Sequence, residues 1–214
     1  MIYLVSAQSH NFKNVKNLKL AKINFKKIDV NLNDFEALII SSKNALKALS
    51  KSKCKLNLKI ELFVLGKKSF DEAKKLGFKN IKISKKSYLK ELVDEFKKDL
   101  EGKKILYLRA KKISYDIAKN SKDLNIKEII AYETNYKKVP EGFVVQRPAT
   151  FIFSSFELAN NFLKQCKLKD EDKIVAIGNS TALRLKGFKN LFISKKQNVR
   201  ECVKLAREIE NAIS

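Results

Sequence analysis

Four short stretches of hydroxyl-bearing residues follow apolar runs and precede amphipathic segments. They are Ser41-Ser42, Gly66 to Ser69, Ser154-Ser155 and Gly178-Asn179-Ser180-Thr181. If the apolar runs are parallel strands, turns at their carboxyl ends form a ligand crevice. The helices that follow offer free backbone N–H groups suited to carboxylates. Any single serine is better explained as a helix N-cap, worth about 1 kcal/mol. The four turns together therefore indicate an anion-binding site.

The chain has few residues for other kinds of chemistry. His10 is its one histidine, which excludes a His-rich metal site and makes any Ser-His-Asp triad depend on that residue. The six glycines form neither G-x-x-x-x-G-K-[ST] nor G-x-G-x-x-G, so nucleotide binding by those loops is excluded. The three cysteines have no C-x-x-C spacing and predict free thiols. We expect no metal and no cofactor.

Lysine gives the chain a formal net charge of +23. Only five of the 46 basic residues are arginine, the residue that nucleic-acid interfaces favour, and the lysines form no dense patch. We therefore expect a solvated basic surface and no nucleic-acid partner, although such a field would steer a multiply charged anion inward. No stretch approaches the roughly 20 apolar residues of a membrane span. We expect no membrane association and a cytoplasmic location.

Short apolar runs alternate with amphipathic stretches, which is typical of a parallel sheet covered on both faces. A helix is predicted over residues 89–100, after Ser87, and another over residues 199–209, after Asn198, with Glu201 placed to close a capping box. Strands are predicted at residues 2–5, 19–24, 37–40, 62–65, 81–84, 105–108, 126–132, 151–153, 174–177 and 191–194.

One sequence occurs twice: GFKNIKISKK at residues 77–86 returns as GFKNLFISKK at residues 187–196. Two copies at so long a period predict a duplicated domain. We predict an α/β fold of two similar Rossmann/flavodoxin-like lobes with parallel sheets, joined by a two-strand hinge. Because the last repeat has too few strands for a sheet, we assign an N-terminal βαβ piece to it. The expected lobes are residues 1–25 plus 138–214 and residues 35–129, with inter-lobe connections at 26–34 and 130–137.

These residues, in this order, resemble the uroporphyrinogen-III synthase family. VAIGNSTA at 175–182 looks like the family's signature, and ISS at 40–42 and FS at 153–154 match its strand-end serine turns. LR at 108–109 is similar to its strand leading to an Arg-Gly turn, and AYETNY at 131–136 to its inter-domain strand. The chain departs from the family where Ser6-Ala7 replaces Thr-Arg, where Ala110 replaces the turn glycine, and where Ser114 replaces a basic residue.

The resemblance implies a hydro-lyase that converts hydroxymethylbilane, a linear tetrapyrrole polycarboxylate, to uroporphyrinogen III with loss of water and inversion of ring D. Such an enzyme needs no cofactor, because it mainly holds its substrate in a productive geometry within an inter-lobe cleft. Tyr132 is the catalytic candidate for assisting hydroxide departure; it is equally interpreted as a structural tyrosine between lobes. Since the hinge must move, we expect a monomer. The expected substrate-binding residues are Ser41, Ser42, Lys43, Ser69, Arg109, Ser154, Ser155, Gly178, Asn179, Ser180 and Thr181.

Two other classes of function remain open at this point. A non-catalytic two-lobed anion-binding protein would share the fold, so only turnover distinguishes it from the synthase. A basic nucleic-acid-binding protein is motivated by the charge alone, and salt-sensitive binding to generic duplex or RNA would identify it.

Overall fold

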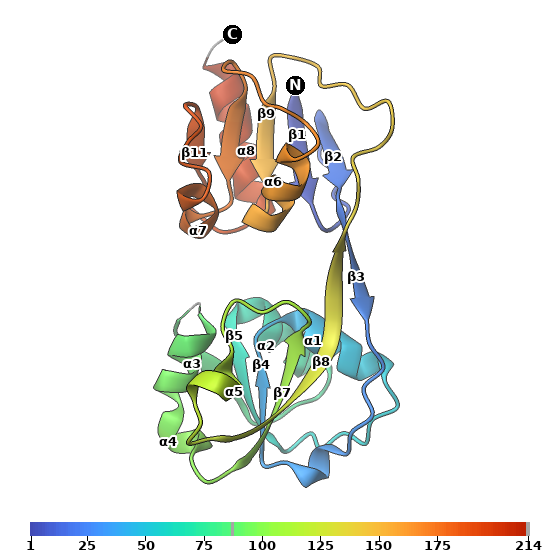
Figure 1. Ribbon diagram of the computed structural model, residues 1–214, viewed down its shortest axis with the longest axis vertical. Helices are drawn as coiled ribbons and strands as arrows, with labels where there is room; N and C mark the ends of the chain where they lie inside the picture. Colours follow the sequence, from blue (N-terminus) through green and yellow to red (C-terminus); the bar gives the residue numbers. More distant parts are fainter. Residues whose placement is uncertain (87, 213–214) are drawn as a thin grey trace. The chain divides into compact units, whose positions relative to one another are not determined.

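The computed structural model describes residues 1–86 and 88–212, in which strands and helices alternate along the chain (Figure 1). The chain divides into two compact units. Unit 1 comprises Met1–Lys22 and Asn135–Ser214, and unit 2 comprises Ile23–Thr134. Each unit has its own sheet with helices on both faces, so the fold is two-lobed α/β with parallel sheets.

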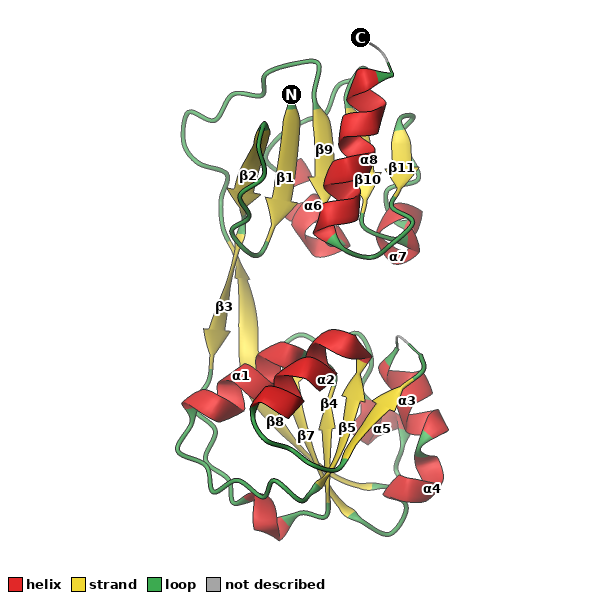
Figure 2. Ribbon diagram, turned by 180° about the vertical axis from the view of Figure 1, so that it is seen from behind, coloured by secondary structure: helices red, strands yellow, loops and turns green. Residues whose placement is uncertain are grey.

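Unit 2 contains a sheet in the order β3-β8-β7-β4-β5-β6, in which the four pairs from β8 to β6 are parallel. Figure 2 shows α1 and α2 in front of this sheet. Residues of α3, α4 and α5 pack on its other face. Two of its strands, β3 and β8, each extend two residues beyond the bounds of the unit. Its elements are β3 (Ala21–Phe25), a 3-10 turn (Leu32–Asp34), β4 (Ala37–Ile40), α1 (Lys43–Lys51), β5 (Glu61–Leu65), α2 (Gly66–Lys75), β6 (Ile81–Ser84), α3 (Leu89–Glu95), α4 (Lys97–Leu100), β7 (Lys104–Ala110), α5 (Ile117–Asn120) and β8 (Asn125–Tyr136).

The position of β4 inside the sheet, between β7 and β5, explains why its sequence is apolar without interruption. Leu38 and Ile40 point to the side of the sheet where α1 and α2 pack, and both are fully buried. Ala37 and Ile39 alternate with them and pack on the other side, against residues of α3, α4 and α5. Side chains alternate between the faces of a strand, so a strand covered by helices on both faces must be apolar throughout. The prediction of doubly covered strands is confirmed.

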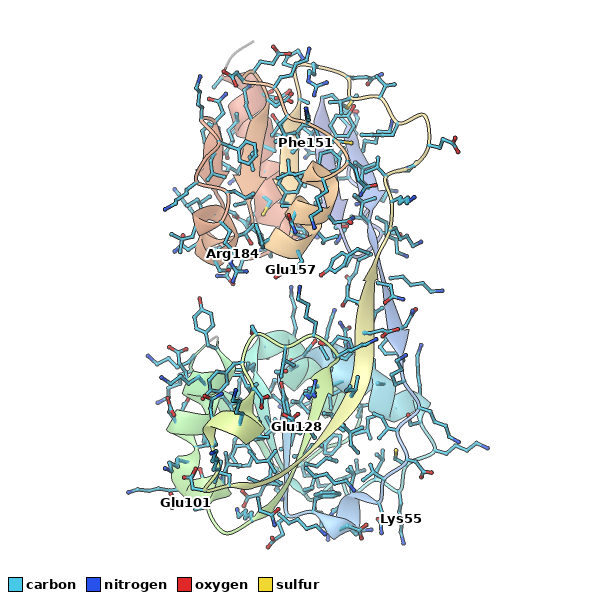
Figure 3. All side chains as sticks on the ribbon, viewed as in Figure 1. Lys55, Glu101, Glu128, Phe151, Glu157 and Arg184 are labelled. Carbon is cyan, nitrogen blue, oxygen red and sulfur yellow. The ribbon has the colours of Figure 1, made fainter. Side chains whose placement is uncertain are left out.

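Unit 1 contains a five-stranded sheet in the order β11-β10-β9-β1-β2, parallel at every pair. The N-terminal strand β1 lies between β9 and β2. On one face, Phe151, labelled in Figure 3, packs on Phe162 of α6 with ring centroids 5.2 Å apart. None of the described helices is long and apolar enough to cross a bilayer. The elements are β1 (Ile2–Ser6), β2 (Val15–Lys19), β9 (Thr150–Phe153), α6 (Phe156–Leu163), β10 (Lys173–Ala176), α7 (Asn179–Leu183), β11 (Leu191–Ile193) and α8 (Val199–Asn211).

The repeated sequence occupies the same structural position in each unit. Asn80 precedes β6, and its side-chain amide donates to the carbonyl of Lys59 at 2.7 Å. Asn190 precedes β11, and its amide donates to the carbonyl of Asp170 at 2.8 Å. In both copies the asparagine carbonyl accepts a backbone hydrogen bond from the neighbouring strand, β5 or β10, at 2.8 Å. The similarity of the two lobes therefore extends to individual hydrogen bonds.

The N-terminal segment differs from the prediction in two ways. In place of one strand over residues 19–24, the structure has β2 and β3 in different sheets, separated at the buried Leu20, whose amide donates to the carbonyl of Ser6. The expected βαβ piece contains no helix, because residues 7–14 form turns and open loop between the parallel strands β1 and β2. That link is shorter than the dozen or so residues that a helical crossover requires.

The helix predicted over residues 89–100 is divided in the structure into α3 and α4. The break falls at Phe96, whose φ of −109° and ψ of 20° are not helical. Its ring packs on Phe63 of β5 with centroids 5.2 Å apart. The predicted starting residue, Ser87, lies outside the described residues. The helix predicted after Asn198 is confirmed as α8, where the Asn198 side chain accepts a hydrogen bond from the Glu201 amide at 2.9 Å.

Candidate functional site

Unit 2 contains a cavity of about 270 Å³ at the carboxyl ends of its central strands. Ser41 and Ser42 follow β4, Leu65 ends β5, and Ala110 ends β7. Residues 112–115, in the loop after β7, and Tyr132 of β8 complete this part of its lining. Carboxyl-end turns are where open parallel sheets bind ligands. The cavity therefore lies where the sequence predicts a site, and it contains three of the predicted residues: Ser41, Ser42 and Tyr132.

Tyrosines dominate the aromatic lining of this cavity. Tyr88, Tyr107, Tyr115 and Tyr132 all line it, which is four of the six tyrosines in the chain. The Tyr107 hydroxyl lies 3.1 Å from Ser41 Oγ, within hydrogen-bond distance. Phenol groups donate hydrogen bonds to oxygen atoms while their rings supply apolar contact area. The cavity is thus suited to a ligand that carries both flat apolar rings and oxygen-bearing substituents.

The two most buried phenols of the cavity stay protonated at neutral pH. Burial raises the pKa of Tyr107 to about 12, although the hydrogen bond with Ser41 opposes part of that rise. Burial also raises the pKa of Tyr132 above its ordinary value of 10.0, opposed by a hydrogen bond with Ser42. In both cases the apolar surroundings disfavour the charged phenolate. Both groups are therefore available as hydrogen-bond donors.

Arg109, predicted as a substrate contact, is held by other protein groups. Its Nε donates to Glu128 Oε2 at 2.7 Å, and its Nη1 donates to the carbonyls of Ala110 and Lys111 at 3.0 and 3.3 Å. Glu128, labelled in Figure 3, lies on β8 beside Tyr107 in the strand register. The Lys111 amide donates in turn to the carbonyl of Tyr132 at 2.9 Å. The guanidinium therefore braces the start of the loop that lines the cavity.

Lys43 begins α1 immediately after the capping residue Ser42, whose Oγ accepts from the amide of Asn44 at 3.3 Å. Burial lowers the pKa of Lys43, and the like charges of Lys47 and Lys68 lower it further. An anion placed near Lys43 would relieve that repulsion. Ser69 lies inside α2 and is only 3% exposed, so the structure does not bring it to the cavity surface.

The remaining predicted residues belong to unit 1. Ser154 and Ser155 follow β9; Ser154 Oγ donates to the carbonyl of Val5 at 3.1 Å, and Ser155 Oγ caps α6 by accepting from the Leu158 amide at 3.2 Å. Both hydroxyls therefore have structural partners. The turn at residues 178–181 follows the neighbouring strand β10, so these two turns lie at adjacent strand ends of one sheet.

Within the turn at residues 178–181, the side chains differ in accessibility. Asn179 and Ser180 are exposed, whereas Thr181 is 4% exposed. Gly178 is buried, and a Cβ added there would lie 3.0 Å from the exposed side chain of Gln197, which would have to shift slightly. Asn179 and Ser180 are the members of this turn that solvent and ligands reach.

Sequence reasoning missed Tyr107, Tyr88, Tyr115 and Lys112 as residues of the cavity. Tyr107 stands in the apolar run at 105–108 and is typical of a core aromatic residue by its position alone. A usable signal was nevertheless present. Four of the six tyrosines fall between residues 88 and 132, in one lobe, and one of them interrupts the apolar run at 105–108 with a hydroxyl.

Two α/β units with parallel sheets, and hydroxyl-rich turns at the strand ends of each, define a class of two-lobed proteins suited to a polyanionic small molecule. A family model described as "Uroporphyrinogen-III synthase HemD" matches residues 11–204, which is most of the chain. The chain belongs to the uroporphyrinogen-III synthase family. This is an enzyme family of heme biosynthesis that acts on a small-molecule tetrapyrrole, and the non-catalytic and nucleic-acid alternatives find no support.

Solved structures are similar over nearly the whole chain. The uroporphyrinogen-III synthetase from Helicobacter pylori is 26% identical, covers 97% of this chain and 98% of its own, and has a TM-score of 0.76. A mutant uroporphyrinogen III synthase from the extremely thermophilic bacterium Thermus thermophilus is 12% identical, covers 99% of this chain and 98% of its own, and has a TM-score of 0.60, which shows a shared fold. No curated protein sequence matches the chain significantly.

Proposed function

We propose that this chain cyclises hydroxymethylbilane to uroporphyrinogen III with loss of water and inversion of ring D, and that the unit 2 cavity takes part in the reaction. The observation that carries the proposal is the position of Tyr132. This tyrosine belongs to the segment that resembles the family's inter-domain strand, and it lines a cavity at the carboxyl ends of parallel strands. Family membership supplies the reaction, and the cavity supplies candidate groups to assist it.

Tyr132 assists the departure of hydroxide in this proposal. The C–O bond of the hydroxymethyl group breaks, and the leaving hydroxide takes a proton from the Tyr132 phenol and departs as water, which leaves a protonated azafulvene and a phenolate. Ring D attacks the methylene carbon of the azafulvene, and closure with inversion follows. The proton that ring D releases as its aromaticity is restored returns to the phenolate. Because burial raises the pKa of Tyr132, the proton is present at neutral pH. A donor aimed at charge that develops in the transition state lowers the barrier more than one that binds substrate alone.

The main task of the protein is to select a geometry. Closure without inversion is spontaneous, so the enzyme must hold the flexible tetrapyrrole where the inverted closure is faster, an effect of proximity and orientation. The eight carboxylates provide the means of holding it. In unit 2 we assign carboxylate binding to Ser41, Ser42 and Lys43. In unit 1 we assign it to the exposed Asn179 and Ser180, with the half-buried Ser154 and Ser155 at the adjacent strand end. The net charge of +23 draws such a substrate towards the surface.

The finer properties follow from the same proposal. The reaction eliminates water, so the enzyme is a cyclising hydro-lyase. We propose a monomer, because a hinge between the two lobes would have to move. Three free cysteines, Cys54, Cys166 and Cys202, support action in the reducing environment of the cytoplasm.

Replacement of one hydroxyl tests the role of Tyr132. We expect Tyr132→Phe to lower kcat for hydroxymethylbilane by roughly 100-fold, the scale of a lost general acid. Tyr136→Phe is the matched control, since Tyr136 lies on the same strand, is 41% exposed and does not line the cavity. Circular dichroism and thermal unfolding establish that both variants fold. A Tyr132→Phe variant that turns over at the wild-type rate removes Tyr132 from the mechanism.

A further inference from the structure

We propose that Ser41 and Tyr107 act together as a hydroxyl pair, defined here as Ser41 Oγ and the Tyr107 hydroxyl, which presents one O–H donor to a carboxylate oxygen of the substrate. The proposal rests on the proposed function and deepens it. It adds Tyr107, which lies in the middle of an apolar strand, to the residues that bind the tetrapyrrole. It also treats Ser41 as half of a unit instead of an independent contact.

The pair carries one proton more than its internal hydrogen bond uses. Each hydroxyl carries one proton, and the two oxygens lie 3.1 Å apart, so one proton forms the hydrogen bond between them. Either oxygen is able to donate in that bond. Whichever does, the other hydroxyl keeps its proton for a further partner. Among the described residues, the structure shows no second hydrogen-bond partner for either oxygen. The pair therefore has one donor to offer, and the count is independent of how the hydrogens are assigned.

The position of the pair directs that donor to the cavity. Both residues line it. Tyr107 is 1% exposed and packs among residues of the α3 side of the sheet, which fixes its ring, while Ser41 is half-buried at the end of the neighbouring strand. Two paired strands hold the two oxygens, so the pair is preorganised before any ligand arrives. A preorganised donor binds with little loss of conformational freedom.

The surroundings favour a negatively charged acceptor. Lys112 also lines the cavity and supplies a positive charge there. Glu128 and Arg109 both act on Tyr107 electrostatically, with opposite signs and Glu128 the stronger, so Lys112 is the charge that favours an anion. The nearby carboxylate of Glu128 is itself engaged by Arg109 at 2.7 Å. A hydroxyl donor binds a carboxylate more strongly than a neutral oxygen, because the hydrogen bond is charge-assisted. A carboxylate of the tetrapyrrole is therefore the partner that this pair fits.

If Ser41 and Tyr107 share one donor, the KM values of single and double variants should differ in a specific way. Ser41→Ala leaves the Tyr107 O–H unpaired, and Tyr107→Phe leaves the Ser41 O–H unpaired, so each single variant still offers a donor. We expect each to raise KM by less than about threefold. The double variant has no donor, and we expect it to raise KM by roughly tenfold to 100-fold, the scale of a hydrogen bond to a charged group, with kcat within about twofold of wild type. A merely structural role would give effects that multiply.

The experiment has two arms. Steady-state kinetics with hydroxymethylbilane give KM and kcat, and equilibrium titration with uroporphyrin III, a stable octacarboxylate, gives a Kd without turnover. The matched control is Tyr3→Phe with Ser50→Ala, which removes the same two groups elsewhere. The Tyr3 hydroxyl accepts from the Gln146 amide in unit 1, and Ser50 Oγ donates to the carbonyl of Lys47 on α1. If the double variant fails to fold, Ser41→Cys with Tyr107→Phe keeps the volume and retains only a weak S–H donor.

The outcomes separate the two proposals. A synergistic rise in KM and Kd confined to the double variant supports the hydroxyl pair. A double variant equal to the product of the single effects, or equal to wild type, overturns it, and a fall in kcat alone overturns the assignment to a carboxylate. A wild-type chain without turnover refutes the proposed function; the pair still stands or falls by the Kd of the double variant.

Discussion

The ion pair between Arg109 and Glu128 offers a direct test of how unit 2 holds its cavity. We predict that Glu128→Gln lowers the free energy of unfolding and, in addition, lowers activity. Arg109 Nε lies 2.7 Å from Glu128 Oε2, and the two side chains are only 18% and 17% exposed. The substitution keeps the size of the side chain but removes the charge, so a guanidinium is left in a largely buried place without its counter-charge.

The size of the loss follows from that burial. Removing one partner of a fully buried ion pair costs about 3–5 kcal/mol, and a hydrogen bond to a charged group is worth about 1.5–3 kcal/mol. Since each side chain keeps about one-sixth of its exposure, we expect a loss of about 2–3 kcal/mol. Arg109→Met with Glu128→Leu removes both charges and replaces them with apolar groups, which is nearly neutral for stability. We expect that double variant to recover most of the lost free energy.

Activity should not recover in parallel. Arg109 Nη1 also donates to the carbonyls of Ala110 and Lys111, which begin the loop that lines the cavity. The double variant loses those hydrogen bonds, so we expect a stable protein whose KM for hydroxymethylbilane stays raised. Recovery of full activity together with stability would show that Arg109 does not brace the loop.

Urea unfolding followed by circular dichroism measures the change in free energy. The control is Asp123→Asn, which breaks the pair between Lys97 Nζ and Asp123 Oδ2 at 2.8 Å, where both side chains are about half exposed. Exposed pairs contribute little because water and salt screen them, so we expect no measurable change. If Glu128→Gln is as harmless as Asp123→Asn, the reasoning from burial is refuted.

Three further predictions concern pH, salt and the repeat. Because burial raises the pKa of Tyr132 above its ordinary value of 10.0, the phenol keeps its proton up to at least pH 10. We therefore expect deprotonation of Tyr132 to cause no fall of kcat below pH 10. A fall of kcat below pH 10 that is present in the wild type and absent in Tyr132→Phe would contradict this. Because the chain carries +23 and the substrate eight carboxylates, kcat/KM should fall as salt rises from about 0.05 to 0.5 M, and an unchanged value would contradict steering. Gly77 has a φ of +90°, and a Cβ added there would lie 3.4 Å from Leu58 Cδ1, whereas Gly187 has no positive φ and open space around it. Gly77→Ala should therefore lower the free energy of unfolding in urea by about 1 kcal/mol or more, and Gly187→Ala should leave it close to unchanged. Equal losses in the two variants would contradict this account.

The sheets were predictable because their strands are buried on both faces. The run at residues 37–40 has no polar position to mistake for a surface, and short runs of this kind bounded by turns are typical of central parallel strands. The division of residues 15–25 into β2 and β3 was not predictable in the same way. One buried leucine, Leu20, separates strands that belong to different sheets, and local sequence carries no information about which sheet a strand joins.

The candidate site was predictable where it depends on turns and not where it depends on register. Ser41 and Ser42 follow a strand and precede a helix, so local pattern alone indicates a strand-end turn. Tyr107 and Arg109 lie on β7, and their partners come from other strands: Ser41 follows β4, and Glu128 lies on β8. Those contacts depend on strand order and register, which a single sequence does not specify.

The central claim is that this chain decides how a flexible polycarboxylate closes into a ring. Freshly prepared hydroxymethylbilane is incubated with the purified chain, with the heat-denatured chain and with buffer, and the type I and type III products are separated after oxidation to porphyrins. The account predicts that type III predominates with the native chain and that type I predominates in both controls. The same ratio of isomers in all three would contradict it.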